Sequence, residues 1–287
     1  MKLAVFTVML PDFTLAETVD VLARTGYDGV EWRVTRNDPK RSAEEPSFWG
    51  NNRSTVNPDL PKTELRQLKE KQDAAGLAVP NLGCYLACGD LAATEQGMQI
   101  ASALGAPSVR VGVPNYDRSE PYGDLLAKGR RYLDGVQDLA QQYGIKGLVE
   151  IHMGNIAASA SLARRLVEGF DPARIGVIHD AGNMVHEGFE NYRLGLELLG
   201  DYLGHVHVKN AVWERTGETP EPPRSSSWRA NWAPLHEGSA DLGQLFADLK
   251  HSGYDGWLSI EDFSQPHPSE ASLRHQAEYL RSLLERV

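Results

Sequence analysis

The chain has 287 residues, of which 41% are hydrophobic and 24% are charged, a composition that is ordinary for a globular protein. Its 29 basic and 39 acidic residues give a formal net charge of −10, which removes the usual electrostatic drive for binding nucleic acid. No apolar run approaches the roughly 20 residues of a membrane-spanning helix. The two cysteines are too few for a disulfide framework. We therefore expect no nucleic-acid partner and no membrane insertion.

The first apolar run, residues 3–10, follows Met1 and Lys2 in the manner of a signal-peptide core. Pro11 ends the run, and no small-residue cleavage pattern follows it. Its β-branched and aromatic residues suit a buried strand better. We expect a strand at this position and a cytoplasmic protein.

Short apolar runs alternate with helical periodicity along the whole chain. Eight runs are expected to form strands, at residues 3–9, 29–34, 79–86, 108–113, 147–153, 175–179, 204–208 and 256–260. Helical spacing of apolar residues marks 15–25, 91–104, 132–143, 158–169, 194–203 and 269–287. Most of the expected strands are almost continuously apolar, which is typical of parallel strands covered on both faces.

A short repeat supports a regular strand–helix architecture. The sequence Gly-Tyr-Asp-Gly occurs at 26–29 and again at 253–256, each time between an expected helix and an expected strand. Eight such units average about 36 residues each, within the range of a (β/α)₈ barrel. The alternative is a doubly wound open sheet, but no G-x-G-x-x-G motif follows the first strand. We predict an α/β protein, a single-domain (β/α)₈ TIM barrel over 1–287.

Two connections, residues 35–61 and 211–234, are too long for simple turns. Both follow the C-terminal end of an expected strand, which in a TIM barrel is the active-site face. Four of the six tryptophans lie in these loops, which argues against disordered insertions; they are Trp49, Trp213, Trp228 and Trp232. We expect the second loop, stiffened by Pro220, Pro222 and Pro223, to fold over the barrel mouth and contact substrate. A subunit interface is the alternative.

Each of the last four expected strands ends in a carboxylate or an imidazole. These side chains are Glu150 with His152, Asp180, His207 with Lys209, and Glu261. Because the C-terminal ends of barrel strands meet at the mouth, we expect the side chains to converge there. Three carboxylates and one imidazole make a plausible site for Mn²⁺, Mg²⁺, Co²⁺ or Zn²⁺.

The four segments around these residues resemble, in order, the metal-ligand strands of the xylose isomerase-like TIM-barrel family. The segments are 149–152, 179–183, 205–210 and 259–261. That family includes sugar-phosphate isomerases and epimerases, inosose isomerases and dehydratases, and apurinic endonucleases. The resemblance implies one divalent ion, with Mn²⁺ as our first expectation, held by Glu150, Asp180, His207 and Glu261. It also implies that Glu150 and Glu261 are the catalytic acid/base pair.

Two positions depart from the pattern of many ketose epimerases in that family. Asn183 stands where those enzymes have a histidine, and Trp213 stands where they have an arginine. Ketose 3-epimerase specificity therefore cannot be assumed. We expect the substrate-binding residues to be His152, Asn183, Lys209, Trp213 and, by strand alternation, Glu31.

A cation in such a site polarises a carbonyl group, and a glutamate then removes the neighbouring proton to give an enediolate. The first expected function is a carbohydrate isomerase or epimerase acting on a keto-sugar or related polyol ketone. The alternative is a lyase, dehydratase or deglycosylating enzyme that uses the same metal site on a keto-sugar or inosose. A non-catalytic binding protein or a nuclease is the third reading, and the net charge of −10 disfavours the nuclease. The expected partner is a small carbohydrate, and the sequence leaves a homo-oligomer open.

Overall fold

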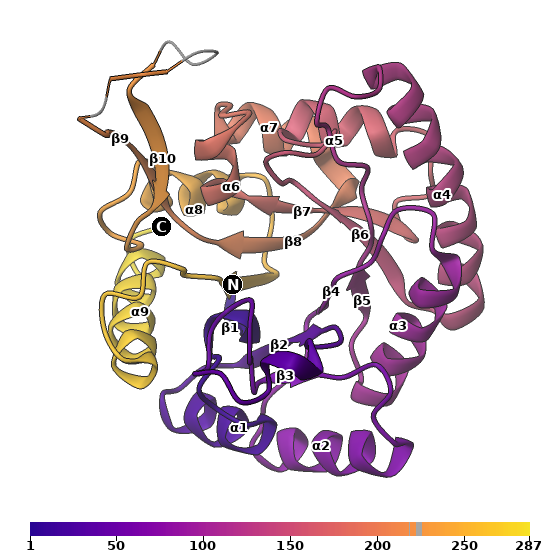
Figure 1. The fold of residues 1–287 in the computed structure, drawn as a ribbon, viewed down its shortest axis with the longest axis vertical. Coiled ribbons are helices and arrows are strands. Elements are labelled where there is room, and N and C mark those ends of the chain that lie inside the picture. Colours follow the sequence, from indigo (N-terminus) through magenta and orange to yellow (C-terminus); the bar gives the residue numbers. More distant parts are fainter. Residues whose placement is uncertain (218, 222–225) are drawn as a thin grey trace.

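The computed structural model describes residues 1–217, 219–221 and 226–287. Pro222 and Pro223, which the sequence predicts to stiffen the second long loop, lie outside the described residues. Eight parallel strands form a closed barrel surrounded by helices (Figure 1). The predicted TIM barrel is therefore confirmed.

The barrel strands follow one another around the ring in chain order. They are β1 (Lys2–Phe6), β2 (Gly29–Val34), β4 (Leu82–Cys84), β5 (Ser108–Arg110), β6 (Lys146–Glu150), β7 (Ile175–Asp180), β8 (Leu203–Val208) and β11 (Trp257–Ile260). β1 pairs with both β11 and β2, and this double pairing closes the ring. The short β3 (Thr55–Val56) pairs with the last two residues of β2, just beyond the end of its pairing with β1.

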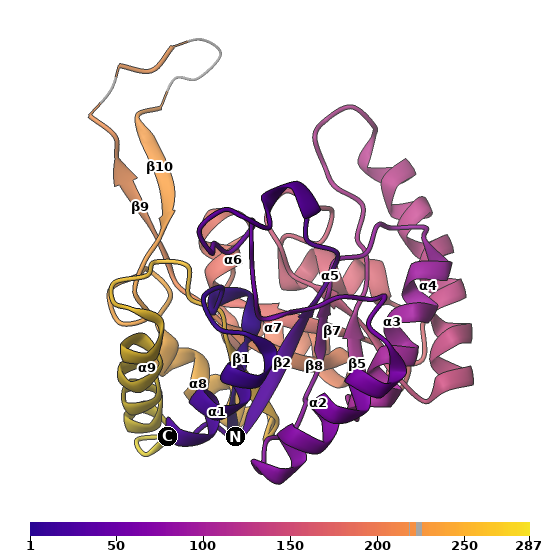
Figure 2. The ribbon, with the colours of Figure 1, turned by 60° about the horizontal axis from the view of Figure 1, so that its bottom comes forward.

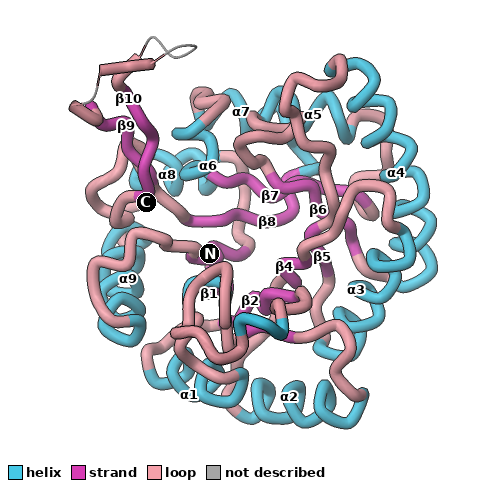
Figure 3. Tube along the Cα trace, viewed as in Figure 1, coloured by secondary structure: helices cyan, strands magenta, loops and turns pink. Residues whose placement is uncertain are grey.

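Helices pack around the outside of the barrel, as the tube view shows (Figure 3). They are α1 (Leu15–Arg24), α2 (Lys62–Ala74), α3 (Leu91–Leu104), α4 (Tyr122–Tyr143), α5 (Ala160–Val167), α6 (Ala181–His186), α7 (Tyr192–Leu199), α8 (Leu242–His251) and α9 (Ser269–Leu284). Short 3₁₀ turns occur at η1 (Thr7–Met9), η2 (Pro39–Arg41) and η3 (Gly200–Tyr202). Among the described residues, no helix combines the length and the apolar character needed to cross a membrane.

Local sequence signals explain where several helices begin and end. Thr14 and Glu17 form a reciprocal capping box at the start of α1. Asp90 caps the first turn of α3, and Gly105 ends that helix in a left-handed conformation with φ of 77°. α4 begins ten residues before the predicted 132–143 segment, because its first turns are largely polar and carry little apolar periodicity.

Two layers of apolar side chains hold the barrel together. Strand residues that point outward, such as Trp32, are buried against the helices, and its indole N–H donates to Gln72 of α2 at 3.1 Å. Phe6 is also fully buried, and it lies over Gly83 of β4. A Cβ atom at position 83 would come within 2.1 Å of the Phe6 ring, so the close approach requires glycine.

The long connection at 211–234 contains an antiparallel hairpin of β9 (Ala211–Arg215) and β10 (Trp228–Trp232). Figure 2 shows this hairpin projecting away from the barrel. The sequence predicts a lid folded over the mouth at this place, whereas the described residues of the connection form this projecting hairpin. The reason is that the two strands satisfy each other's backbone hydrogen bonds, from Trp232 opposite Ala211 to Trp228 opposite Arg215.

Candidate metal centre and active site

The four predicted metal ligands come together at the C-terminal end of the barrel. Glu150 and Asp180 end β6 and β7, His207 lies near the end of β8, and Glu261 directly follows β11. One ligand-type atom from each residue lies within 4.8 Å of the others. His207 Nδ1 is 2.9 Å from a Glu150 oxygen, 3.7 Å from an Asp180 oxygen and 4.0 Å from a Glu261 oxygen. The arrangement is compact enough to surround one small ion.

Two buried cations lie against these carboxylates. Arg110 Nη1 is 2.7 Å from Glu150 Oε2, and Lys209 Nζ is 3.1 Å from Asp180 Oδ2 and also forms an ion pair with Glu261. Burial alone would raise the pKa of Glu150, but the Arg110 guanidinium and His207 hold it well below its usual range. For Glu261, burial dominates and raises the pKa above its usual value. The two glutamates therefore occupy electrostatically different surroundings.

The charges and donors of the site fit a divalent cation. The buried carboxylates at or next to the site are Glu31, Glu150, Asp180 and Glu261. Arg110 and Lys209 supply two positive charges against these four negative ones, which leaves an excess of two negative charges that a dication would offset. Burial would lower the pKa of His207, but the surrounding carboxylates raise it well above its usual value. The site therefore attracts positive charge, and carboxylate oxygens with one imidazole suit Mn²⁺, Mg²⁺, Co²⁺ or Zn²⁺.

Asn183 links two of the predicted site residues. Asp180 caps α6, because its Oδ1 accepts the Asn183 backbone N–H at 2.8 Å, and its Oδ2 accepts the Asn183 side-chain N–H at 2.9 Å. The Asn183 carbonyl oxygen accepts from Lys209 Nζ at 3.0 Å. Asn183 is fully buried and orients Asp180 and Lys209, so the geometry does not support the substrate contact that the sequence predicts for it.

A cavity of about 700 Å³ opens onto the predicted ligands Glu150 and Glu261. Its aromatic wall consists of Trp49, Tyr85, Trp232 and Phe263. Its polar lining includes His152 and Lys209, both predicted as substrate contacts, together with Asn115 and Asn155. The size is that of a small-molecule site, and aromatic faces are suited to packing on the C–H faces of a sugar.

Besides Asn183, two other predicted substrate contacts do not line this cavity. Trp213 lies on β9 with 46% of its surface exposed, and its indole N–H donates to the Val185 carbonyl at 2.7 Å. Glu31 points inward, as strand alternation predicts, but it is fully buried and does not reach the cavity at the mouth, where substrate contact was expected. Conversely, Arg110 and Tyr85 line the cavity and were not predicted. A charged residue inside the expected strand at 108–113 was the available signal for Arg110.

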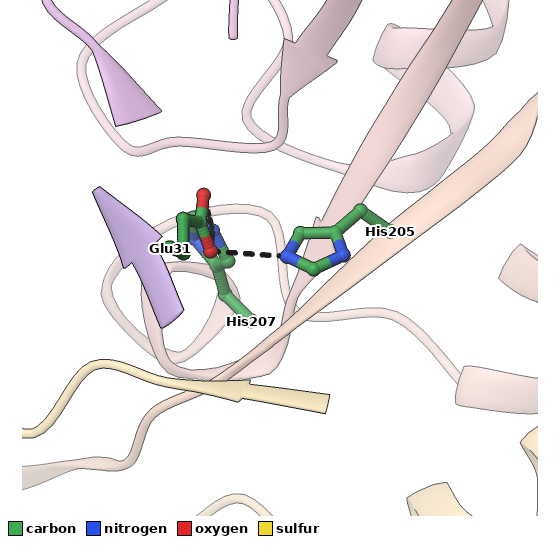
Figure 4. Close-up of side chains that lie close together, drawn as sticks. All are labelled: Glu31, His205 and His207. Carbon is green, nitrogen blue, oxygen red and sulfur yellow. Dashed lines mark hydrogen bonds and ion pairs between the residues drawn. The ribbon is translucent and has the colours of Figure 1, made fainter. Parts of the chain in front are cut away.

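A second cluster of ligand-type side chains lies next to the first. Glu31 Oε2 is 3.0 Å from His205 Nε2, and both Glu31 oxygens are 3.2 Å from His207 Nε2 (Figure 4). His207 therefore belongs to both clusters, with Nδ1 toward the four predicted ligands and Nε2 toward Glu31. All three side chains are buried.

Comparison with known proteins agrees with this architecture. The xylose isomerase-like TIM barrel family model matches residues 19–283. An inosose dehydratase from Geobacillus thermodenitrificans (strain NG80-2) is 27% identical over 202 residues, which span 66% of this chain and 62% of that enzyme. The match thus covers less than two thirds of that relative's length.

Solved structures show the same fold. An IOLI protein with a bound zinc atom superposes with a TM-score of 0.74 at 16% identity, covering 100% of this chain and 99% of that one. A 3-keto-D-glucoside 4-epimerase from E. coli superposes with a TM-score of 0.71 at 17% identity, covering 98% of this chain and 99% of that one. Because the family model matches most of the sequence and the closed barrel is the one it describes, this chain belongs to the xylose isomerase-like TIM barrel family.

Proposed function

We propose that this chain is a divalent-metal-dependent dehydratase that acts on an inosose or a related keto-sugar. The observation that carries the proposal is the convergence of Glu150, Asp180, His207 and Glu261 within 4.8 Å beside a cavity of about 700 Å³. The similarity to an inosose dehydratase supports elimination at least as well as the isomerisation that the sequence first suggests. The zinc atom of the IOLI protein supports the presence of a metal in this fold, and the identity of the metal here is part of the proposal.

Each residue around the cavity has a separate role in the proposed elimination. A bound divalent cation would polarise the substrate carbonyl and offset the charge that develops on its oxygen. Glu150, kept ionised by Arg110, removes the proton from the carbon next to the carbonyl. Glu261 relays a proton from the Lys209 ammonium, with which it is paired, to the departing hydroxyl group, which leaves as water as the carbon–carbon double bond forms. Lys209 holds Glu261 and Asp180 in place through its ion pairs.

The cavity favours an unphosphorylated ring. Arg110 and Lys209, the cationic lysine and arginine side chains in its lining, are both already paired with site carboxylates. Binding a phosphate group would therefore require either side chain to give up its carboxylate partner. Trp49, Trp232 and Phe263 instead offer apolar faces, on which the C–H face of a cyclic polyol can stack.

Epimerisation is the second candidate. Glu150 and Glu261 come from different strands, β6 and the end of β11, and both line the cavity. With one on each side of the substrate, one could remove the proton and the other return it to the opposite face. The fold similarity to a 3-keto-D-glucoside 4-epimerase makes this reaction worth testing beside elimination.

One experiment separates these reactions. The purified protein, loaded in turn with Mn²⁺, Mg²⁺, Co²⁺ and Zn²⁺, is incubated with a panel of inososes and keto-sugars in D₂O. A dehydratase loses water and produces a new unsaturated or dicarbonyl product, whereas an epimerase returns an isomer that contains deuterium without losing water. The Glu150→Gln variant, prepared in parallel, controls for contaminating enzymes. If the wild-type protein binds metal but neither exchanges deuterium nor loses water with any substrate, the proposal is wrong.

A further inference from the structure

We propose that Glu31 is a positioning residue for His207: it accepts the Nε2–H of the imidazole and so keeps the Nδ1 lone pair directed toward the metal site. The inference rests on the proposed metal-dependent function. It replaces the substrate contact that strand alternation predicts for Glu31. The argument depends on where the Glu31 carboxylate lies, on what holds it there, and on what His207 would do without it.

The carboxylate of Glu31 faces the side of His207 that points away from the predicted ligands. Its two oxygens are each 3.2 Å from Nε2 (Figure 4). Nδ1, on the other side of the ring, lies 2.9 Å from Glu150. Phe6 stacks on the same imidazole with a centroid distance of 5.6 Å and an interplanar angle of 28°. The imidazole ring is therefore held at both nitrogens by carboxylates and on one face by Phe6.

Glu31 is itself fixed by a chain of hydrogen bonds across the barrel interior. Asn81 donates its amide N–H to Glu31 Oε1 at 2.7 Å, and Ser108 donates its hydroxyl to the Asn81 carbonyl oxygen at 2.8 Å. His205 Nε2 lies 3.0 Å from Glu31 Oε2. Ser108 belongs to β5, Asn81 directly precedes β4, and His205 belongs to β8. Residues from three other parts of the barrel therefore hold the Glu31 side chain of β2 in place.

The burial of Glu31 has no evident structural benefit. The side chain is fully buried, and among the described residues its ion-pairing partners are two histidines rather than a lysine or arginine. A buried carboxylate is costly unless its surroundings compensate it. An apolar residue would fill the same interior position without that cost, so the carboxylate is best explained by its effect on His207.

The hydrogen bond selects one form of the His207 ring. A neutral imidazole carries its proton on one nitrogen only, and the acceptor at Nε2 favours the form with a free lone pair on Nδ1. Without that acceptor, the proton could move to Nδ1, where it would form a hydrogen bond to Glu150, whose oxygen lies 2.9 Å away. The ring would then have no lone pair to offer a metal on the side of Asp180 and Glu261.

A second metal ion between Glu31, His205 and His207 is the competing interpretation, because these side chains also form a ligand-type group. The distances of 3.0 to 3.2 Å are those of hydrogen bonds. A metal there would also require His207 to bind ions through both nitrogens. The two interpretations differ in stoichiometry, one metal per chain against two.

The test measures Mn²⁺ affinity and stoichiometry for the wild-type protein, Glu31→Gln and Asn81→Ala. We expect one metal per wild-type chain and a dissociation constant raised roughly 10- to 100-fold by Glu31→Gln, with a smaller rise for Asn81→Ala. Gln72→Leu is the matched control, since Gln72 is a buried polar partner of the neighbouring Trp32 on the outer side of β2. It should lower the melting temperature without changing Mn²⁺ affinity.

Nitrogen-15 NMR of histidine in the Zn²⁺-loaded protein provides a readout that general destabilisation does not move. The wild-type protein should show a protonated Nε2 and a metal-bound Nδ1 for His207, and Glu31→Gln should weaken or redistribute that signature. Unchanged Mn²⁺ affinity together with an unchanged spectrum in Glu31→Gln would overturn this inference and leave the proposed function intact. Two metals per chain that both depend on Glu31 would have the same consequence. If Glu31→Gln does not fold, unchanged affinity in Asn81→Ala counts against the inference. A wild-type chain that binds no metal would overturn the proposed function as well.

Discussion

Buried charge governs the behaviour of individual residues at the barrel mouth. Arg110 and Lys209 are each held between site carboxylates and aromatic rings; Arg110 lies 4.4 Å from the Tyr85 ring centroid and Lys209 lies 5.0 Å from that of Trp232. Removing one member of a buried charged pair typically costs about 3–5 kcal/mol, because the other member is left uncompensated. Substitutions that keep shape and change only charge are therefore the informative ones here.

Asp180→Asn should weaken metal binding and reduce turnover together. The side-chain oxygen of asparagine can still cap α6 by accepting the Asn183 N–H, but the substitution removes a negatively charged ligand. Changing a residue that merely supports a ligand already costs roughly 10- to 100-fold in metal affinity, so we expect a loss of about 100-fold or more. Metal analysis after gel filtration measures the effect. Full occupancy in a variant lacking both Asp180 and His207 would exclude this ligand set.

Glu150→Gln and Glu261→Gln should each lower kcat by ~10²–10⁴-fold, the usual contribution of a general acid or base. Both residues are also predicted ligands, so each variant is assayed at saturating Mn²⁺ with its metal content measured. A glutamine variant that retains its metal and turns over at the wild-type rate has no proton-transfer role at that position.

At the scale of elements, the β9–β10 hairpin distributes its tryptophans unevenly. Strand pairing places Trp213, Trp228 and Trp232 on one face, because Trp213 lies opposite Ala230, Trp228 opposite Arg215 and Trp232 opposite Ala211. Trp232, at the base, lines the cavity, whereas Trp228, nearer the tip, is 48% exposed. The hairpin therefore contributes to the site through its base.

Trp232→Ala should raise KM for the best substrate roughly 2- to 10-fold, the range expected from losing one aromatic packing contact. Trp228→Ala is the matched control on the same face of the hairpin and should leave KM nearly unchanged. Steady-state kinetics with both variants decide the point. Equal increases in KM from Trp228→Ala and Trp232→Ala would instead mean that the hairpin closes over the mouth, as the sequence predicts.

Gly83→Ala tests the packing of β4 against β1. The added methyl group would meet the Phe6 ring at 2.1 Å, and Phe6 in turn stacks on His207. Overpacking of this kind typically costs about 1–3 kcal/mol, and displacement of Phe6 should also weaken metal binding. Gly123→Ala is the control, because nothing lies within 4 Å of its added Cβ in helix α4. It should be neutral or stabilise the protein by up to about 1 kcal/mol, as denaturant unfolding will show. Equal destabilisation of the two variants would argue against the Phe6 clash.

At the scale of the whole molecule, the four predicted ligands come from four neighbouring strands in the second half of the barrel. They come from β6, β7, β8 and the end of β11, which are adjacent in the sheet, and β11 closes the ring by pairing with β1. The last helix is held to the first by the Arg24–Glu270 ion pair. It is also held to the segment that follows α1 by the Tyr27 hydroxyl, which donates to the Leu273 carbonyl at 2.9 Å. A metal bound by all four strands would therefore be coupled to global unfolding.

Metal removal should lower the melting temperature of the whole domain in a single transition. A ligand that binds only the folded state adds about 2.7 kcal/mol at 100 times its dissociation constant. We expect EDTA to remove that stabilisation and Mn²⁺ to restore it, as followed by calorimetry. The Asp180→Asn variant should show little response to either reagent. A wild-type melting temperature that ignores both would contradict a structural link between the metal and the barrel.

The sequence by itself determined the order of the eight barrel strands, the closed barrel and the four residues that meet at its end. Its apolar periodicity marked no helix at α2 or α8. Period-two alternation and the position of a residue at a strand end are local properties, and in a closed parallel barrel they suffice to bring Glu150, Asp180, His207 and Glu261 to one place. Glu31 shows the limit of these local properties. Alternation predicts that its side chain points into the barrel, but not how far from the mouth it lies.

Only the tertiary structure decided which side chains lie opposite one another across the barrel. Glu31 meets His207, and Arg110 meets Glu150, from strands that are far apart in sequence. The same holds for 211–234, where aromatic content predicts burial but the partner of each strand is the other strand of the hairpin. These contacts depend on the register and stagger of the closed sheet, which fix distances between strands that no local pattern encodes.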